Sequence, residues 1–171
     1  MRNLIKLADG QAQLVTDDAW SLVQSQEPTG LPAGPLILPL NMWRERQPQA
    51  VLDCEASSLH GVWLSPDDEP ETLTPWLSVL PLIALDFPSF RDGRAYSQAY
   101  LLRSRLGWQG ELRATGDVLR DQLSHMRQCG FDAFAVREDK SAEDALKGLA
   151  GISVLYGRSV VEPRPLFRRR G

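Results

Sequence analysis

The chain has 171 residues, of which 43% are hydrophobic and 24% are charged, as is typical of a globular protein of one domain. These proportions exclude a wholly disordered, collagen-like or coiled-coil chain. A chain of this length buries roughly two-thirds of its unfolded surface, so it needs no disulfide or metal to fold. The net charge of −3 excludes the strongly basic footprint that is typical of nucleic-acid binding.

The N-terminal region predicts a β-hairpin. Residues 4–8 and 11–15 are separated by Asp9-Gly10, a dipeptide that favours two-residue turns because both positions accept positive φ angles. A short helix or a third strand is expected near residues 19–23. A loop rich in Pro and Gly follows at residues 25–35.

Beyond this loop, short apolar runs alternate with segments of helical periodicity. The expected strands cover residues 36–40, 61–64, 82–85, 111–115, 131–136 and 152–156. The expected helices cover residues 41–47, about 70–80, 94–106, 117–128 and 141–149. Asp68 is the N-cap candidate for the second helix, and Pro75 predicts a kink or a split within it.

This alternation predicts an α/β fold with a mainly parallel sheet flanked by helices and an N-terminal β-hairpin. Two arrangements fit the strand count, an open three-layer sheet and a truncated TIM-barrel-like sheet. A single domain is expected over residues 1–156, with residues 1–24 as its hairpin region. Residues 157–171, which contain five arginines, are expected to form a mobile tail.

Cysteine and histidine usage argues against a metal centre. Cys54 and Cys129 form no CxxC pair, and two cysteines cannot hold an iron–sulfur cluster with four thiolate ligands. His60 and His125 show no zinc-ligand spacing, so we expect neither a metal nor a resident cofactor. The start of the chain lacks the apolar region of a signal peptide, and no apolar run has the length of a membrane span, so the expected location is the cytoplasm.

Candidate functional residues are sought in the loops that follow the predicted strands, because ligands of parallel sheets gather beyond the carboxyl ends of the strands. This rule selects residues 65–69, 86–94, 115–117 and 137–140, whose polar side chains are expected to face one edge of the sheet. The first and densest cluster comprises Asp86, Asp92, Gly93, Arg94, Tyr96 and Ser97. Two interpretations stay open for it. Either Asp92 caps a helix and Arg94 pairs with a nearby acid, or the helix start and Arg94 hold an anion or a partner.

The second cluster comprises Arg113, Gly116, Asp117 and Arg120. A guanidinium within a buried strand needs a partner, and Asp117, Arg120 and Asp121 are expected to form a network with Arg113 at the start of a helix. Paired carboxylates also suit acid–base chemistry, but Walker A, G-x-S-x-G and H-E-x-x-H motifs are absent, and no catalytic residue can be named.

Charge is distributed unevenly along the chain. Residues 1–92 carry 13 acids and 5 bases, whereas residues 93–171 carry 9 acids and 14 bases. This asymmetry either arises by chance on a solvated surface or indicates a basic face in the second half that meets an anion or an acidic partner. Arg94 and Arg120 are expected on such a face.

Three stretches carry a family resemblance. LIALDFPSFRDGRAYS at 82–97, GELRATGDVLRDQ at 110–122 and CGFDAF at 129–134 resemble a bacterial family, the domain of unknown function 934. Asn3-Leu-Ile5 and Asp18-Ala-Trp20 also fit, so the resemblance extends over residues 1–156. The positions that match the family motif are Asp86, Asp92, Gly93, Arg94, Tyr96, Ser97, Arg103, Arg113, Gly116, Asp117, Arg120, Asp121 and Cys129.

The resemblance implies an oxidoreductase of sulfite reduction, from a family encoded beside a sirohaem-dependent sulfite reductase. Reduction of sulfite needs a cofactor to carry electrons, and this chain offers no evident site for one. We therefore expect an accessory protein that docks on the sulfite reductase haemoprotein or on its electron donor. The alternative is a small-molecule enzyme or carrier of sulfur metabolism that binds an anionic ligand at the carboxyl ends of the strands.

Overall fold

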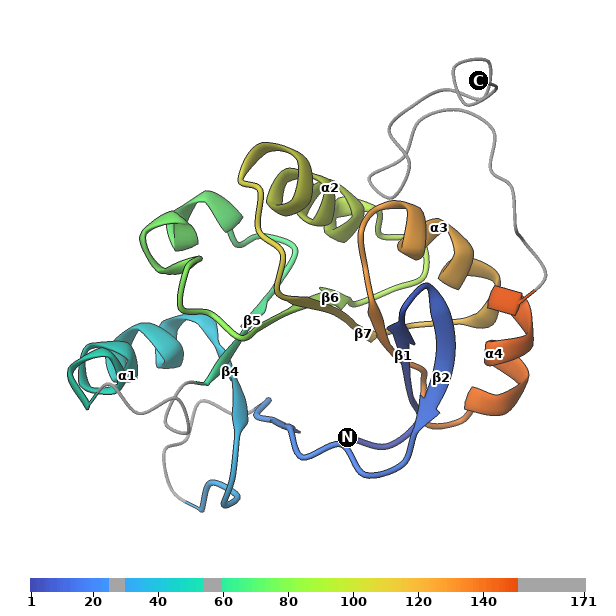
Figure 1. Cartoon of the computed structure of the whole chain (residues 1–171), viewed down its shortest axis with the longest axis horizontal. Helices are drawn as coiled ribbons and strands as arrows, with labels where there is room; N and C mark the ends of the chain where they lie inside the picture. The colour runs from blue at the N-terminus through green and yellow to red at the C-terminus, as the bar shows by residue number, and fades with distance from the viewer. Residues whose placement is uncertain (25–29, 54–59, 151–171) are drawn as a thin grey trace.

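A computed structural model describes residues 1–24, 30–53 and 60–150. In this part of the chain, eight strands form one sheet in the order β2-β1-β8-β7-β6-β5-β4-β3, and the sheet curls strongly (Figure 1). The strands are β1 (Leu4–Ala8), β2 (Gln11–Val15), β3 (Ser21–Leu22), β4 (Leu36–Pro39), β5 (Gly61–Leu64), β6 (Leu82–Phe87), β7 (Glu111–Gly116) and β8 (Ala133–Ala135).

Helices lie on the convex side of the curled sheet (Figure 1). They are α1 (Leu40–Asp53), the 3₁₀-helix η2 (Pro70–Trp76), α2 (Arg94–Tyr100), the π-helical segment η3 (Leu101–Arg105), the 3₁₀-turn η4 (Arg120–Gln122), α3 (Leu123–Gln128) and α4 (Ala142–Ala150). None of these helices combines the length and the apolar character that a membrane span needs.

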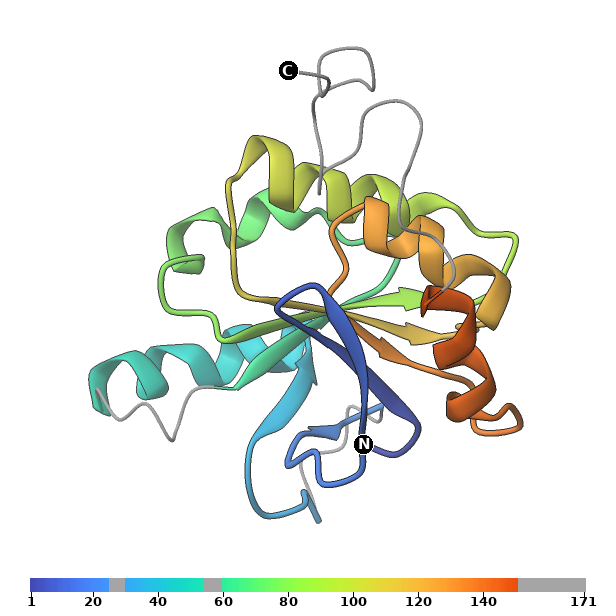
Figure 2. The ribbon, with the colours of Figure 1, turned by 45° about the vertical axis from the view of Figure 1, so that its right-hand side comes forward.

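The N-terminal hairpin is confirmed at the predicted residues. Leu4–Ala8 pairs antiparallel with Gln11–Val15, and the turn residues Asp9 and Gly10 have φ angles of 51° and 78°. β1 also pairs antiparallel with β8, which places the hairpin at one end of the sheet beside α4 (Figure 2).

The α/β class and the mainly parallel sheet are also confirmed, since β3 to β8 pair in parallel in their chain order. Sequential parallel strands joined by right-handed crossovers carry each connecting helix to the same face. A three-layer sheet needs a reversal of strand order, and these six strands have none. The curled sheet therefore matches the barrel-like arrangement and not the open three-layer one.

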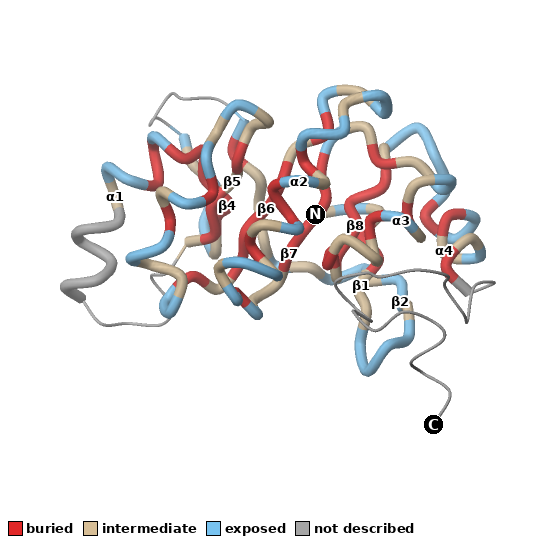
Figure 3. The backbone as a smooth tube through the Cα atoms, turned by 90° about the horizontal axis from the view of Figure 1, so that it is seen from above, coloured by how far each residue is buried: buried red, intermediate tan, exposed pale blue. Residues whose placement is uncertain are grey.

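The two faces of the sheet carry separate clusters of buried apolar side chains. On β6, Ile83, Leu85 and Phe87 pack against the helices, whereas Leu82 and Ala84 belong to a separate apolar cluster on the concave face. The buried residues follow the central strands, and the exposed ones gather in loops and on the outer sides of helices (Figure 3).

Several elements differ from the sequence prediction. α1 continues through Pro48 to Asp53, where a loop was predicted. The predicted helix at 70–80 is a 3₁₀-helix with Pro75 inside it, and Asp68 accepts a hydrogen bond from the Ser65 N–H instead of capping that helix. The tighter 3₁₀ turns accommodate the proline, in place of the kinked or split α-helix that we expected.

A further difference lies after β7. Gly116, at φ 90°, ends the strand, and helical structure begins at Arg120, so Asp117 does not lie on the helix predicted over 117–128. β6 also extends to Phe87, which places Asp86 in a strand and not in a loop. The predicted strand at 152–156 and the tail at 157–171 lie outside the described residues, and the single-domain boundary at 156 stays a prediction.

Candidate functional site

The carboxyl ends of β5 to β8 form one rim of the curled sheet, because the four strands run in parallel. We use "rim" for the loops that follow these strands: residues 65–69, 88–93, 117–119 and 137–140. Most of the candidate residues predicted from sequence lie in or next to these loops. Three of them, Asp92, Arg94 and Asp117, belong to two ion-pair clusters at this rim.

The first is the Arg94 cluster, which consists of Asp67, Asp92 and Arg94. The Asp92 carboxylate accepts hydrogen bonds from the Arg94 backbone N–H at 3.1 Å and from its Nη2 at 2.7 Å, and Arg94 Nη1 also pairs with Asp67. The pKa of Asp92 is lowered by its hydrogen bonds to Arg94. Gly93, just before α2, has a φ of −92°, so the unusual backbone freedom of glycine is not used there.

The second is the Arg137 cluster, which consists of Asp117, Arg137 and Asp139. Arg137 Nη1 donates to Asp117 at 2.7 Å, and its Nη2 donates to Asp139 at 2.7 Å. The pKa of Asp139 is lowered, chiefly by its hydrogen bond to Arg137. Each cluster thus holds two carboxylates for one guanidinium and leaves a net charge of −1.

Asp117 also fixes the loop after β6. Its other carboxylate oxygen accepts a hydrogen bond from the Phe90 N–H at 2.7 Å, and Gln122 Nε2 donates to the Phe90 carbonyl at 2.6 Å. Phe90 is thereby held at both backbone groups, while its side chain remains exposed. The Asp117 contact joins the rim loops after β6, β7 and β8.

Asp86 stands apart from these clusters. Strand alternation places its side chain on the concave face with Ala84, and its neighbour in register on β7 is Thr115. Thr115 accepts a hydrogen bond from the Trp63 indole at 3.3 Å. The carboxyl of Asp86 forms no hydrogen bond with any described residue, and burial followed by the charge of Asp92 raises its pKa.

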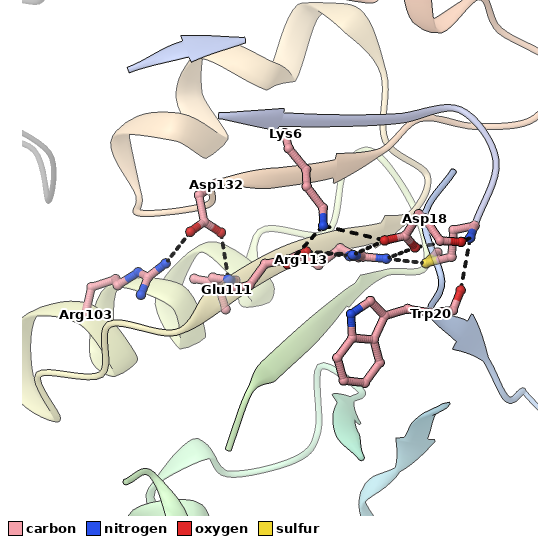
Figure 4. Close-up of polar contacts among 9 residues, drawn as sticks. Lys6, Asp18, Trp20, Arg103, Glu111, Arg113 and Asp132 are labelled. Atoms are coloured by element: carbon pink, nitrogen blue, oxygen red, sulfur yellow. Dashed lines mark hydrogen bonds and ion pairs between the residues drawn. The ribbon is translucent and has the colours of Figure 1, made fainter. Parts of the chain in front are cut away.

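The concave face also contains the Arg113 network, formed by Lys6, Asp18, Glu111 and Arg113 (Figure 4). Arg113 is fully buried, and its Nη1 and Nη2 donate to the two oxygens of Asp18 at 2.8 and 3.1 Å. Arg113 Nε and Nη2 also donate to Glu111, and Nη1 contacts the Met1 sulfur. All five N–H groups of the guanidinium are therefore used within the chain.

The partners of Arg113 correct the sequence prediction, which expected Asp117, Arg120 and Asp121. Asp18 is nearly as inaccessible as Arg113, with a side chain that is 1% exposed. Burial alone would raise the pKa of Asp18, but the hydrogen bonds and charge of Arg113, followed by the Met1 amino group, lower it. Lys6 pairs with both Asp18 and Glu111.

The remaining candidates lie on the convex side or on helix surfaces. Arg120 pairs with Asp144 of α4 at 3.1 Å. Tyr96 packs between Phe87 and His125, with ring centroids 5.0 and 4.5 Å away. Burial, then the charge of Cys129, raises the pKa of Tyr96, whereas Ser97 is exposed on α2.

Cys129 is a partly buried free thiol whose sulfur lies 4.0 Å from His125 Nε2. Burial raises the pKa of Cys129, which opposes formation of the reactive thiolate. No group of three or more potential metal-ligating side chains occurs in the described ranges.

Sequence reasoning selected the loops that contain these residues but did not predict which residues pair. Arg94 was expected to pair with a nearby acid, and it pairs with Asp92 and Asp67, whereas Asp92 is not the N-cap of α2, a position that Gly93 occupies. Asp67 and Arg137 come from loops far away along the chain, and no local spacing relates them to Arg94 or Asp117. Phe90 was also missed as a site residue. A large apolar side chain within a polar loop was the available signal.

The fold and the rim define an α/β protein with a curled, mainly parallel sheet and acid-rich strand ends. A family model described as a bacterial protein of unknown function, the domain of unknown function 934, matches residues 61–167. The match covers more than half of the chain, and the chain therefore belongs to this family. No curated protein matches it.

Proposed function

We propose that this protein is a cytoplasmic accessory protein of sulfite reduction that docks on the sirohaem sulfite reductase or on its electron donor. One observation favours docking over anion binding. Arg94, Arg113 and Arg120, the predicted anion-binding guanidiniums, are each engaged by carboxylates of the same chain. An incoming sulfite or sulfate would have to displace a carboxylate, whereas a protein surface can dock on the intact clusters.

Docking is tested with purified components. The full chain is mixed with sirohaem sulfite reductase, or separately with its electron donor, and the mixture is run on a size-exclusion column. We expect the chain to elute with one of these proteins, and with the sirohaem absorption if the partner is the reductase. Separate elution from both proteins at micromolar concentrations, supported by calorimetry without heat of binding, would overturn the proposal.

Anion binding is tested in parallel by thermal unfolding. A ligand at 100 times its dissociation constant stabilises a protein by about 2.7 kcal/mol, which raises the Tm of a chain of this size by roughly 5–10 °C. We expect sulfite, sulfate and phosphate to cause no such shift at constant ionic strength. A saturating shift that Arg94→Gln abolishes would instead favour a carrier of anions.

A second candidate function, a small-molecule enzyme of sulfur metabolism, is favoured by Asp86. This carboxyl lies near the carboxyl end of a parallel strand, is partly buried and has a raised pKa, a combination suited to general acid–base work. An ionised Asp86 would repel an anion, so the residue suits proton transfer and not anion capture.

The raised pKa of Asp86 gives a pH prediction. A raised pKa in the folded state means that ionisation of Asp86 costs stability above that pKa and costs nothing below the unfolded pKa of about 3.9. Asp86→Asn is therefore expected to raise the Tm at pH 7, with a difference from wild type that disappears towards pH 3. Carboxyl-carbon NMR should show a high titration midpoint for Asp86, which falls in Asp92→Asn. A midpoint in the ordinary range for aspartate would remove the support for this candidate.

A further inference from the structure

The loop after β6 presents an exposed aromatic side chain on a fixed backbone. Phe90 is 49% exposed, although large apolar side chains are usually buried when the fold allows it. The Phe90 N–H and carbonyl are both held by side chains, those of Asp117 and Gln122. Ordering this loop upon binding would therefore cost little, because much of that entropy has already been lost on folding.

Arg91 extends the exposed surface of Phe90. Its guanidinium carbon lies 5.3 Å from the centroid of the Phe90 ring, in a cation–π arrangement. Aromatic and arginine side chains are enriched at the centres of protein interfaces, where truncating one of them often removes much of the affinity. Phe90 and Arg91 together are called the Phe90 knob below.

The charges beside the Phe90 knob are predominantly negative, and the two clusters together with Arg91 of the knob sum to a net charge of −1. Asp92 of the Arg94 cluster follows the knob directly in sequence, and Asp117 of the Arg137 cluster bonds to Phe90 itself. Each cluster leaves a net charge of −1, and the Asp67 and Asp139 side chains are 84% and 55% exposed. A partner with positive charge around an apolar pocket would be complementary to this surface.

We infer that the Phe90 ring inserts into an apolar pocket on the sulfite reductase haemoprotein, and that Lys and Arg side chains at the border of this pocket face the acidic clusters beside the knob. This inference rests on the proposed function and selects between its two partners. An acidic electron carrier such as a ferredoxin or flavodoxin would face the net negative clusters and be repelled. The inference also replaces Arg94 and Arg120, the expected basic docking residues, with a surface of opposite net charge.

The test compares Phe90→Ala with Tyr100→Ala as a matched control. Tyr100 is 55% exposed at the far end of α2, so both substitutions remove an exposed aromatic ring. Thermal unfolding of each variant checks that the fold is retained. The affinity of each full-length variant for purified sulfite reductase, and for its electron donor, is then measured by calorimetry at two salt concentrations.

We expect Phe90→Ala to weaken binding to the reductase by at least about thirtyfold and Tyr100→Ala by less than about threefold. Wild-type affinity should fall as salt rises, because opposite charges attract across the interface. Equal affinities of wild type and Phe90→Ala would overturn the Phe90 knob and leave the proposed function standing. Failure of wild type to bind either protein would overturn the proposed function, and the inference with it.

Two further outcomes identify a different occupant. Binding to the acidic electron carrier that depends on Phe90 would contradict the charge argument and overturn the choice of partner. Dimerisation of the chain that Phe90→Ala abolishes, measured by analytical ultracentrifugation, would show that a second copy occupies the knob, and would also overturn the inference.

Discussion

Arg113→Met is expected to destabilise the fold by about 3–5 kcal/mol, the usual cost of leaving a buried charge without its partner. Arg113 is fully buried on the concave face, and the Asp18 side chain that it binds through two hydrogen bonds is 1% exposed. Methionine retains the length and apolar character of the arginine stem but leaves the Asp18 carboxylate with fewer donors. The loss of unfolding free energy is measured by urea unfolding at pH 7.

Arg120→Met is the control for this experiment. Arg120 and Asp144 form an ion pair whose side chains are 47% and 58% exposed, and exposed pairs contribute about 0–1 kcal/mol. We expect a clear separation between the two variants. A loss of unfolding free energy below about 1 kcal/mol for Arg113→Met would mean that Lys6 and solvent stabilise the Asp18 charge instead. The Arg113–Asp18 pair would then contribute little to the stability of the fold.

A double variant distinguishes lost charge pairing from lost packing. Replacing both members of a buried pair by apolar residues is often neutral or stabilising, so Asp18→Leu combined with Arg113→Met should recover much of the loss. The lowered pKa of Asp18 adds a pH signature. Its stabilising contribution is present above the unfolded pKa of about 3.9 and is lost as the pH falls through the folded pKa. Arg113→Met should therefore lose less stability than wild type on acidification.

Local signals explain the parts of the fold that the sequence predicted well. Asp9-Gly10 specifies its hairpin because the turn depends on two adjacent residues. The apolar runs at 36–40, 61–64 and 82–85 identify their strands because parallel strands buried on both faces are continuously apolar. The start of α4 is local in the same sense, because Ser141 accepts a hydrogen bond from the N–H of Asp144, three residues away.

The polar contacts of the site could not be predicted in the same way. Asp18 and Arg113 are 95 residues apart, and Asp67 and Arg94 are 27 apart, so their pairing depends on the curl of the sheet and not on helical spacing. The expected network of Arg113 with Asp117 assumed a helix that starts at residue 117. The left-handed backbone of Gly116 turns Asp117 towards Phe90 instead. The family resemblance correctly selected this segment but could not assign its contacts.

Gly116→Ala is expected to destabilise the fold by about 2–5 kcal/mol, and it tests how β7 supports the rim. Gly116 has a φ of 90°, and a Cβ there would lie 2.4 Å from the Phe87 carbonyl oxygen and 2.6 Å from an Asp86 carboxylate oxygen. Left-handed strain contributes about 1–2 kcal/mol, and the forced shift of neighbouring atoms adds about 1–3 kcal/mol. The loss is measured by urea unfolding.

Gly107→Ala separates the backbone strain of Gly116→Ala from its steric clash. Gly107 also has a positive φ, of 67°, but a Cβ there meets no atom within 4 Å, so its substitution should cost about 1–2 kcal/mol.

The clash at Gly116 has a further consequence, because the Phe87 carbonyl accepts the Asp117 N–H at 2.7 Å and Asp117 holds Phe90. Moving that carbonyl should loosen the Phe90 loop. The Phe90 amide hydrogen should therefore exchange with solvent faster in Gly116→Ala than in Gly107→Ala. Equal stability and equal exchange in the two variants would show that the rim tolerates a side chain between β6 and β7.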